Sequence, residues 1–304
     1  MPSLNQNLSR LFLKWNRSKA LRYYQKNARK QAAPAKRQFR QRLGYEANLN
    51  EPQTHSEHTL LRKLRDHDPR FPRLTDKYTA RAWLDEVMGA GFSDTYCVPL
   101  LARALCFEDL PSSLWDQDVI LKASHMSGRN YVVRQGDTVA KKIARRKLKR
   151  SLTKVFGWRR YEWAYLDLEP SIVAEPLLQG GDILDLKLYV YDGVVRYFMV
   201  ENNSGPKPAL TVFDTEWKPL DMTWEAYEAF TAEPPTSLPE IVSLATQIAK
   251  GFDQLRVDFL ITPERFYLGE LTLYDASGLV RFDSYASDRL VGQYWNQSHL
   301  RVGR

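Results

Sequence analysis

The sequence predicts an α+β fold with antiparallel sheets, preceded by a basic helical segment at the N-terminus. Strand-like runs in the second half are joined by tight turns, as at Asp192-Gly193 between residues 184–191 and 194–200. The regular alternation of strands and helices that indicates a parallel sheet is missing from the sequence pattern. Residues 1–45 instead mix apolar residues with Lys and Arg at roughly helical spacing, which predicts one or two basic amphipathic helices.

The net charge of +8 is concentrated at the N-terminus. Residues 1–50 contain twelve Lys and Arg residues against the single Glu46, whereas the remaining 254 residues carry a net charge of −3. Such a segment either contacts an anionic membrane surface or an acidic polymer, or packs on the rest of the protein with its charges in water. No zinc finger, helix-turn-helix or RNA-binding pattern accompanies it, so no specific nucleic acid is expected.

The apolar content is that of an ordinary globular chain. No stretch approaches the roughly 20 apolar residues that a membrane span needs, and the first thirty residues lack the apolar core of a signal peptide. We therefore expect a cytoplasmic protein, either free or peripheral to the inner face of the membrane. Cys97 and Cys106 lack the spacing of a metal site and are expected to be free thiols in an apolar setting.

Residues 71–170 are expected to form a mixed region that ends in a basic helix. Its expected elements are a helix over 76–84, a strand over 119–122 that enters a polar loop, a strand over 131–133, and a helix within 138–160 whose cations run from 141 to 150. Thr75 or Asp76 is the expected N-cap of the first helix. The basic helix and the aromatic residues of 158–163 either bind an anionic glycan or form a solvated lid.

Residues 171–304 are richer in strand signals. The expected elements are strands over 171–175, 184–191, 194–200, 255–261 and 266–273, and an amphipathic helix over 239–250. A turn over 262–265 joins the last two strands, so they form a hairpin.

This last hairpin carries the most informative side chains. Alternation places Arg256 and Asp258 on one face of the first strand, and Glu270 and Thr272 on one face of the second. The turn sets Asp258 opposite Glu270. Two facing carboxylates call for a cation, which is either Mg²⁺ or Arg256 itself, unless both are solvated.

Two lysines lie in strand-like surroundings where phosphate oxygens would be suitable partners. Lys122 ends a buried strand just before Ser124, His125, Ser127 and Gly128, a polar loop of the kind that closes over phosphates. Lys187 lies within an apolar strand, where a lysine is seldom buried without a partner. That partner is either a phosphate or Asp185, two residues earlier on the same face.

Taken in order, these segments resemble the TupA-like ATP-grasp family, which is associated with teichuronopeptide and surface-polysaccharide biosynthesis. The resemblance covers roughly residues 60–290. It rests on Asp76-Lys77-Tyr78 with Arg81, Val119 to Gly128, Ile172 to Leu178, Asp185-Leu186-Lys187, Arg256-Val257-Asp258, and Gly269-Glu270-Leu271-Thr272. It implies a basic N-terminal arm over 1–70 and two α+β subdomains, over 71–170 and 171–304, that clamp ATP.

The resemblance also implies roles for single residues. Lys77 and Lys122 would contact phosphates, with the loop of Ser124, Ser127 and Gly128 closing over them. Glu175 to Leu177 would hold adenine through the backbone, and Asp185 would bind the ribose. Asp258, Glu270 and Thr272 would hold Mg²⁺, while Arg256, Lys187 and His125 would act at the reacting phosphoryl group; for His125 a purely structural role in the loop is the alternative.

The implied activity is that of an ATP- and Mg²⁺-dependent carboxylate-amine ligase, in the carboxylate-amine/thiol class. It would work through an acyl phosphate and join an amino acid or amine to a uronic acid of a glycan or sugar nucleotide. The alternatives are an ATP-dependent sugar or glycan kinase, a non-catalytic ATP-binding module, and a basic docking protein. Thr272 stands where many related ligases have Asn, and residues 1–75 do not resemble their N-terminal α/β domain. His55, His58 and His67 have only the spacing of polar linker residues.

Overall fold

The computed structural model describes residues 4–29, 33–178, 183–202, 209–224 and 227–300, and the side chains of 4–12 and 27–29 lie outside this description. The chain divides into two compact units. Unit 1 comprises residues 1–31, 68–83 and 98–179, and unit 2 comprises residues 32–67, 84–97 and 180–304. Residues 1–70, expected from the sequence to be one arm, are thus shared between the two units.

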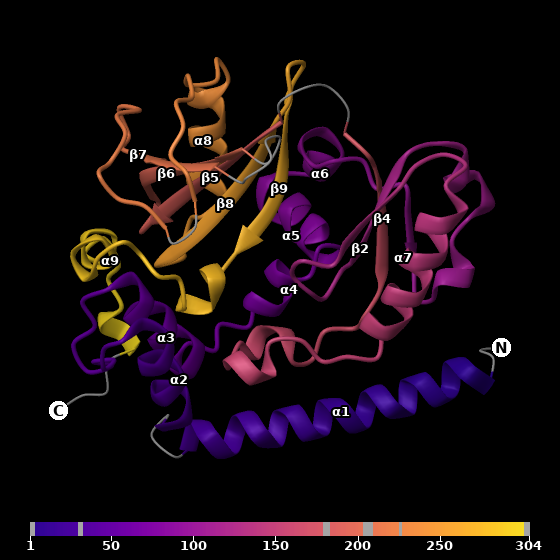
Figure 1. Cartoon of the computed structure of the whole chain (residues 1–304), viewed down its shortest axis with the longest axis horizontal. Helices are drawn as coiled ribbons and strands as arrows, with labels where there is room; N and C mark the ends of the chain where they lie inside the picture. Colours follow the sequence, from indigo (N-terminus) through magenta and orange to yellow (C-terminus); the bar gives the residue numbers. More distant parts are fainter. Residues whose placement is uncertain (1–3, 30–32, 179–182, 203–208, 225–226, 301–304) are drawn as a thin grey trace. The chain divides into compact units, whose positions relative to one another are not determined.

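Unit 1 is built on a four-stranded antiparallel sheet with the order β1-β4-β2-β3, of which Figure 1 labels the two central strands, β2 and β4. Its strands are β1 (Ala102–Ala104), β2 (Val119–Ala123), β3 (Asn130–Val133) and β4 (Ile172–Pro176). Its helices are α1 (Leu4–Arg29), α4 (Phe71–Thr75), α7 (Thr138–Ser151) and the short 3-10 turns η1 (Phe107–Asp109), η2 (Ser112–Asp116), η3 (Trp158–Arg160) and η4 (Trp163–Tyr165). Helix α5 (Thr79–Met88) crosses the boundary between the units.

Side chains alternate along β2, so the two faces of this sheet carry different kinds of residue. Val119, Leu121 and Ala123 are fully buried, and they pack with Ala144 and Leu148 of α7 in one apolar core. Lys122 and its neighbour Glu175 of β4 lie on the opposite face, because strand residues alternate. The burial of one face by α7 therefore leaves the charged pair on the other.

Helix α1 is held to unit 1 by aromatic and polar contacts. Tyr23 makes an edge contact with Trp158 of η3, at 5.1 Å between ring centroids, and lies 6.1 Å from Tyr161. The Asn16 amide donates to the carbonyl of Thr153 at 3.0 Å, and Arg17 pairs with Asp167. The expected basic N-terminal helix is present, and it packs on the protein along one side.

Unit 2 contains a five-stranded antiparallel sheet with the order β7-β6-β5-β8-β9 (Figure 1). Its strands are β5 (Leu184–Tyr191), β6 (Val194–Asn202), β7 (Ala209–Phe213), β8 (Gln254–Ile261) and β9 (Phe266–Thr272). Its helices are α2 (Ala33–Leu43), α3 (His55–Arg65), α6 (Phe92–Tyr96), α8 (Leu238–Ile248) and α9 (Tyr285–Gly292), with turns η5 (Asp275–Gly278) and η6 (Ser298–Leu300).

The two faces of this sheet differ in chemistry. Helix α8 packs against β5, β6 and β8 on one face. On the other face, registered pairs place Lys187 beside Asp258, and Tyr189 beside Arg256. The aromatic end of this polar face packs on Val291 of α9 and on Trp295. A row of charged side chains therefore crosses the middle of the sheet, next to an apolar cluster.

Helix α3 corrects the expectation that His55 and His58 are polar linker residues. Both are buried, at 4% and 3% exposure, and only His67 is exposed. The Thr54 hydroxyl accepts from the Glu57 N–H while the Glu57 carboxylate accepts from the Thr54 N–H, a capping box that starts the helix. The segment is therefore part of the core of unit 2.

The α+β class with antiparallel sheets and N-terminal helices is confirmed, although the short strands β1 and β7 and helix α9 were not anticipated. Asp76 acts as expected near a helix start, since its carboxylate accepts from the N–H groups of Tyr78 and Thr79. Both cysteines are free thiols, and Cys97 is buried. In the described part of the chain, no helix has the length and apolar character needed to cross a membrane.

Candidate functional site

The β8–β9 hairpin places its charged residues as the sequence predicted. Asp258 pairs in register with Glu270, and Arg256 with Thr272. The Asp258 carboxylate accepts two hydrogen bonds from Arg256, Nε to Oδ1 at 2.8 Å and Nη2 to Oδ2 at 2.6 Å. Of the two facing carboxylates, Arg256 therefore pairs with Asp258, and no ion pair between Arg256 and Glu270 is found among the described residues.

Arg256 has a second carboxylate partner that the sequence reasoning missed. Asp275 of η5 accepts from Arg256 Nη1 and from the Tyr189 hydroxyl, and it is 6% exposed. Thr272 Oγ1 accepts from Arg256 Nη2 at 3.1 Å. The guanidinium is therefore fixed on three sides. The sequence feature that could have identified Asp275 is its position, three residues after the Gly269 to Thr272 motif.

Lys187 lies within the same polar face and is nearly buried, with 6% of its side chain exposed. It pairs with Asp185 and, at 3.2 Å, with Glu201 of β6. Burial by itself lowers the pKa of Lys187, but Asp185, Asp258 and Glu201 outweigh burial and the net shift is upward. The ammonium group is therefore charged at neutral pH. Glu201 is a further residue that the sequence did not single out; it lies opposite Asp185 in the β5–β6 register.

The charges of this face favour an additional cation. Five carboxylates accompany two cations; the carboxylates are Asp185, Glu201, Asp258, Glu270 and Asp275, and the cations are Lys187 and Arg256. Burial raises the pKa of Asp258, and Arg256 and Lys187 oppose that shift. Within the described part of the chain, the Glu270 side chain has no hydrogen bond or ion pair. Oxygen ligands of this kind fit Mg²⁺, with Glu270 available and Asp258 shared with Arg256.

In unit 1, the phosphate-side candidate Lys122 is held by a carboxylate. Its Nζ lies 2.5 Å from Glu175 Oε2, and Arg81 of α5 lies 3.0 Å from Glu175 Oε1. All three side chains are largely buried: Lys122 is 15% exposed, Glu175 7% and Arg81 12%. The role assigned from the sequence to the backbone of Glu175 stays a prediction; in the structure the Glu175 side chain pairs with two cations.

The loop after β2 is attached to the start of α5. Lys77 Nζ donates to the Met126 carbonyl at 2.8 Å, and its backbone N–H donates to the Ser124 carbonyl. The Ser124 hydroxyl is buried and donates to Asp76 at 2.7 Å. Ser127 and Gly128 are exposed, and Gly128 has a φ of +65° that favours glycine. The exposed part of the loop, unlike Ser124, is open to a ligand.

His125 belongs to this loop, and it is buried, at 1% exposure. Its Nε2 lies 3.2 Å from the Ser151 carbonyl, so it is the protonated nitrogen that donates. Burial lowers the pKa of His125 to about 4. The neutral ring therefore joins the loop to the end of α7, as the structural alternative for this residue predicts.

The segment after β4 was expected to hold adenine through its backbone. The Leu177 N–H donates to the carbonyl of Asp118 at 3.0 Å. Leu177 as a whole is half-buried. The role of this segment in nucleotide binding stays a prediction.

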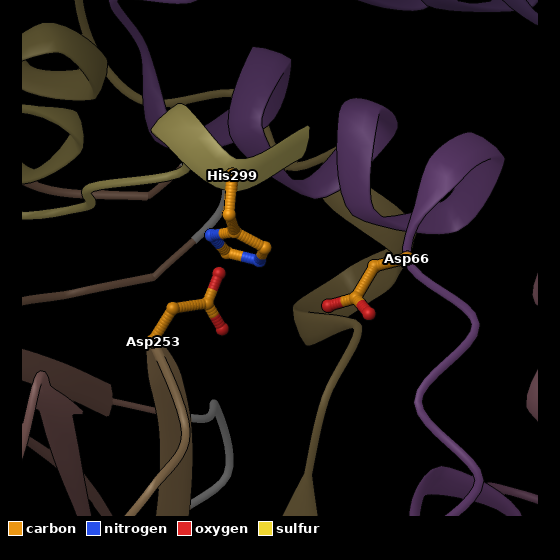
Figure 2. A group of neighbouring side chains, drawn as sticks. All are labelled: Asp66, Asp253 and His299. Atoms are coloured by element: carbon orange, nitrogen blue, oxygen red, sulfur yellow. The ribbon is translucent and has the colours of Figure 1, made fainter. Parts of the chain in front are cut away.

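A second group of potential ligands lies elsewhere in unit 2. Figure 2 shows Asp66 at the end of α3, Asp253 before β8 and His299 on η6 pointing toward one another, and their ligand atoms lie within 4.8 Å. Arg62 pairs with both carboxylates, and the Trp295 indole donates to Asp253 at 2.8 Å. Arg62 thus supplies the cation that these carboxylates need, which makes this a structural ion-pair cluster.

Comparison with known families decides the assignment. A family model described as TupA-like ATPgrasp matches residues 57–296, most of the chain. The chain belongs to the TupA-like ATP-grasp family. This confirms the resemblance found in the sequence, and the matched range includes the candidate site residues from Lys77 to Asp275.

Similar solved structures share little sequence with this TupA-like chain. They include a D-alanine–D-alanine ligase from Bacillus anthracis, at 16% identity and a TM-score of 0.40, covering 66% of this chain and 57% of that one. The ATP-grasp ligase PsnB complexed with minimal precursor, Mg and ADP has 15% identity, a TM-score of 0.40, and coverages of 67% and 52%. The D-alanine–D-alanine ligase from Helicobacter pylori has 12% identity, a TM-score of 0.37, and coverages of 73% and 61%.

This chain therefore spans between 52% and 61% of the length of these three chains. A comparison with curated proteins finds no match.

Proposed function

We propose that this chain is an ATP- and Mg²⁺-dependent carboxylate-amine ligase that acts through an acyl phosphate. Family membership supports the use of ATP. The observation that carries the proposal is the charged face of unit 2, where Glu270 has no partner in the described chain and lies in register with Asp258, beside Arg256 and Lys187. A face with more carboxylates than cations is suited to a divalent ion that accompanies phosphates.

In this proposal, the chain's own residues bind and orient charge. Glu270 and Asp258 would hold Mg²⁺, and Thr272 would be a weaker oxygen ligand. Arg256 and Lys187 are placed to stabilise negative charge on the transferred phosphoryl group. The bound ion neutralises triphosphate charge, as it does in phosphoryl transfer generally.

The residues of unit 1 would contact the nucleotide. Lys122 and Lys77 would contact phosphate oxygens, and Ser127 and Gly128 would close over them through backbone N–H groups, with Ser124 anchoring the loop. On nucleotide binding, Lys122 would either replace its ion pair with Glu175 by a contact with phosphate, or contact both groups. Glu175 to Leu177 would bind adenine, and Asp185 of unit 2 would bind the ribose hydroxyls. His125 would support the loop and act as a positioning residue.

The reaction needs no side-chain nucleophile. A substrate carboxylate oxygen attacks the γ-phosphorus, the bond between that phosphorus and the β–γ bridging oxygen breaks, and ADP leaves. An amine then attacks the acyl carbon, phosphate departs, and the amine nitrogen loses a proton as the amide forms. Positioning and electrostatic stabilisation supply the catalysis.

We infer the substrate class from the family. The acid would be a uronic acid of a surface polysaccharide, of its precursor or of a sugar nucleotide, and the second substrate would be an amino acid or another amine. Such precursors would be modified in the cytoplasm, where residues 1–50 would make peripheral contact with a membrane or an anionic polymer.

Calorimetry with ATP tests the nucleotide and metal assignments. We expect ATP to bind more tightly with Mg²⁺ than without it, and Glu270→Gln to remove most of that difference. Glu264→Gln is the matched control, because Glu264 is exposed in the turn of the same hairpin. Absence of ATP binding under every condition would overturn the proposal.

Product analysis separates the ligase from its alternative. A ligase releases phosphate only when both a uronic acid and an amine are present. Phosphate transfer to a glycan alone, with no amine dependence, would instead identify a sugar or glycan kinase. Binding of ATP without turnover on any acid and amine pair would indicate a non-catalytic module.

A further inference from the structure

Helices α1 and α7 of unit 1 expose cations that have no carboxylate partner among the described residues. On α7 these cations follow one side, since Lys142, Arg146 and Arg150 are spaced four residues apart. The full set on the two helices is Lys14, Lys19, Arg22 and Lys26 on α1, and Lys142, Arg146, Lys147 and Arg150 on α7.

The cations that do have partners point elsewhere. Arg17 of α1 pairs with Asp167, and the neighbouring Ala20 and Tyr24 are buried. On α7, Arg145 and Lys149 both pair with Glu108, at 2.8 Å and 2.7 Å. Each helix thus uses one side for contacts with its own unit and presents a second, basic side to solvent.

Large apolar side chains lie among these cations, and Lys19 Nζ lies over the Trp15 ring, 5.4 Å from its centroid. Trp15 and Leu21 of α1 are 56% and 46% exposed, and Val139 and Ile143 of α7 are 68% and 43% exposed. With 3.6 residues per turn, Val139 falls between Arg146 and Arg150 around the helix, and Ile143 lies beside Arg150, on the solvent side of α7. Exposed aliphatic side chains gain little free energy from contact with water or with a hydrophilic polyanion, even where lysine and arginine surround them.

The two basic sides belong to one body. Asn16 of α1 hydrogen-bonds to the carbonyl of Thr153, two residues beyond the end of α7. The last turn of α7, which carries Arg150, is therefore close to the middle of α1, which carries Trp15.

We propose that the exposed sides of α1 and α7 form a docking surface for an anionic lipid membrane. Cations attract the negatively charged leaflet of an anionic membrane. Trp15, Leu21, Val139 and Ile143 enter the interfacial region, where indole and aliphatic groups are favoured. The apolar residues select lipid over a soluble polyanion. This surface does not depend on the proposed ligase activity.

Vesicle co-sedimentation of the full chain tests the proposal. We expect binding to vesicles with about one third phosphatidylglycerol but not to pure phosphatidylcholine, and loss of binding when salt rises from about 0.1 M to about 0.5 M. Arg146→Gln with Arg150→Gln should weaken binding at least about fivefold. The matched double variant, Arg145→Gln with Lys149→Gln, removes the same charge from the paired side and should weaken it less.

The apolar residues supply the decisive comparison. Val139→Ser with Ile143→Ser leaves the charge unchanged and should reduce vesicle binding severalfold, as should Trp15→Ser, while circular dichroism verifies folding. Equal vesicle binding by the two double charge variants would overturn the proposed surface. Unchanged binding by the serine variants, together with equal affinity for soluble polyglutamate, would overturn the lipid assignment and indicate a polyanion instead.

Discussion

Asp275 holds Arg256 from the side opposite Asp258, and it also accepts a hydrogen bond from the buried Tyr189 hydroxyl. The two carboxylates have different surroundings. Asp258 is in register with Glu270, the proposed metal ligand, whereas Asp275 is enclosed by its two donors. If Asp258 turns toward a metal ion, Asp275 still keeps the guanidinium in place. We therefore expect Asp275 to be a positioning residue for Arg256.

Asp275→Asn should lower kcat by up to about a hundredfold while changing the KM for ATP little, because misplacement of Arg256 affects the transferred phosphoryl group. Asp283→Asn makes the same change at an exposed carboxylate and should have no effect. Breaking a buried ion pair typically costs about 3–5 kcal/mol of unfolding free energy. The loss here should be smaller, because Asp258 still pairs with Arg256. An unchanged kcat with full ATP binding would contradict the positioning role.

Lys122→Met should weaken ATP binding by about tenfold to a hundredfold, the range for losing a hydrogen bond from a charged group. Calorimetry measures the effect, with Lys250→Met as the exposed control. Glu175→Gln should instead free Lys122 and leave ATP binding unchanged or tighter. Wild-type affinity in Lys122→Met would remove this lysine from the proposed site.

The stability of the protein should fall between pH 7 and pH 5, partly because of His125. Burial lowers the pKa of His125 from 6.5 to about 4, so the unfolded chain binds more protons than the native one in this interval. Stability therefore rises with pH through this window, by about 2 kcal/mol from this residue. Urea denaturation at both pH values should give a shallower dependence for His125→Asn than for the wild type. His67→Asn, at an exposed histidine, should retain the wild-type slope.

Arg62→Met should lower the unfolding free energy by about 3–5 kcal/mol, because it leaves Asp253 buried without its cation. Arg134→Met is the surface comparison and should cost less than about 1 kcal/mol, since Arg134 is 70% exposed beside Asp118. Divalent metal ions should not raise the melting temperature of the wild type through the cluster in Figure 2. A metal-dependent increase that Asp66→Asn removes would identify a metal site there instead.

Local pattern was sufficient to predict the hairpin and its register. Strand alternation and the length of the turn are local properties, and they placed Asp258 opposite Glu270 without knowledge of the rest of the fold. The same applies to strand β2, which carries Lys122, and to the basic helix α7, whose cations the sequence shows directly. The order of short motifs along roughly residues 60–290 also predicted the family, which the family-model match over 57–296 confirms.

The partners of these residues were decided only by the tertiary structure. Asp275 approaches Arg256 because η5 folds back over β8, and Glu201 approaches Lys187 because β6 pairs with β5. The burial of His55 and His58 depends on the packing of α3 within unit 2, which polar residues alone do not indicate. Periodicity specifies which side of an element a residue occupies. Which distant residue then meets it is set by how whole elements pack to bury apolar area.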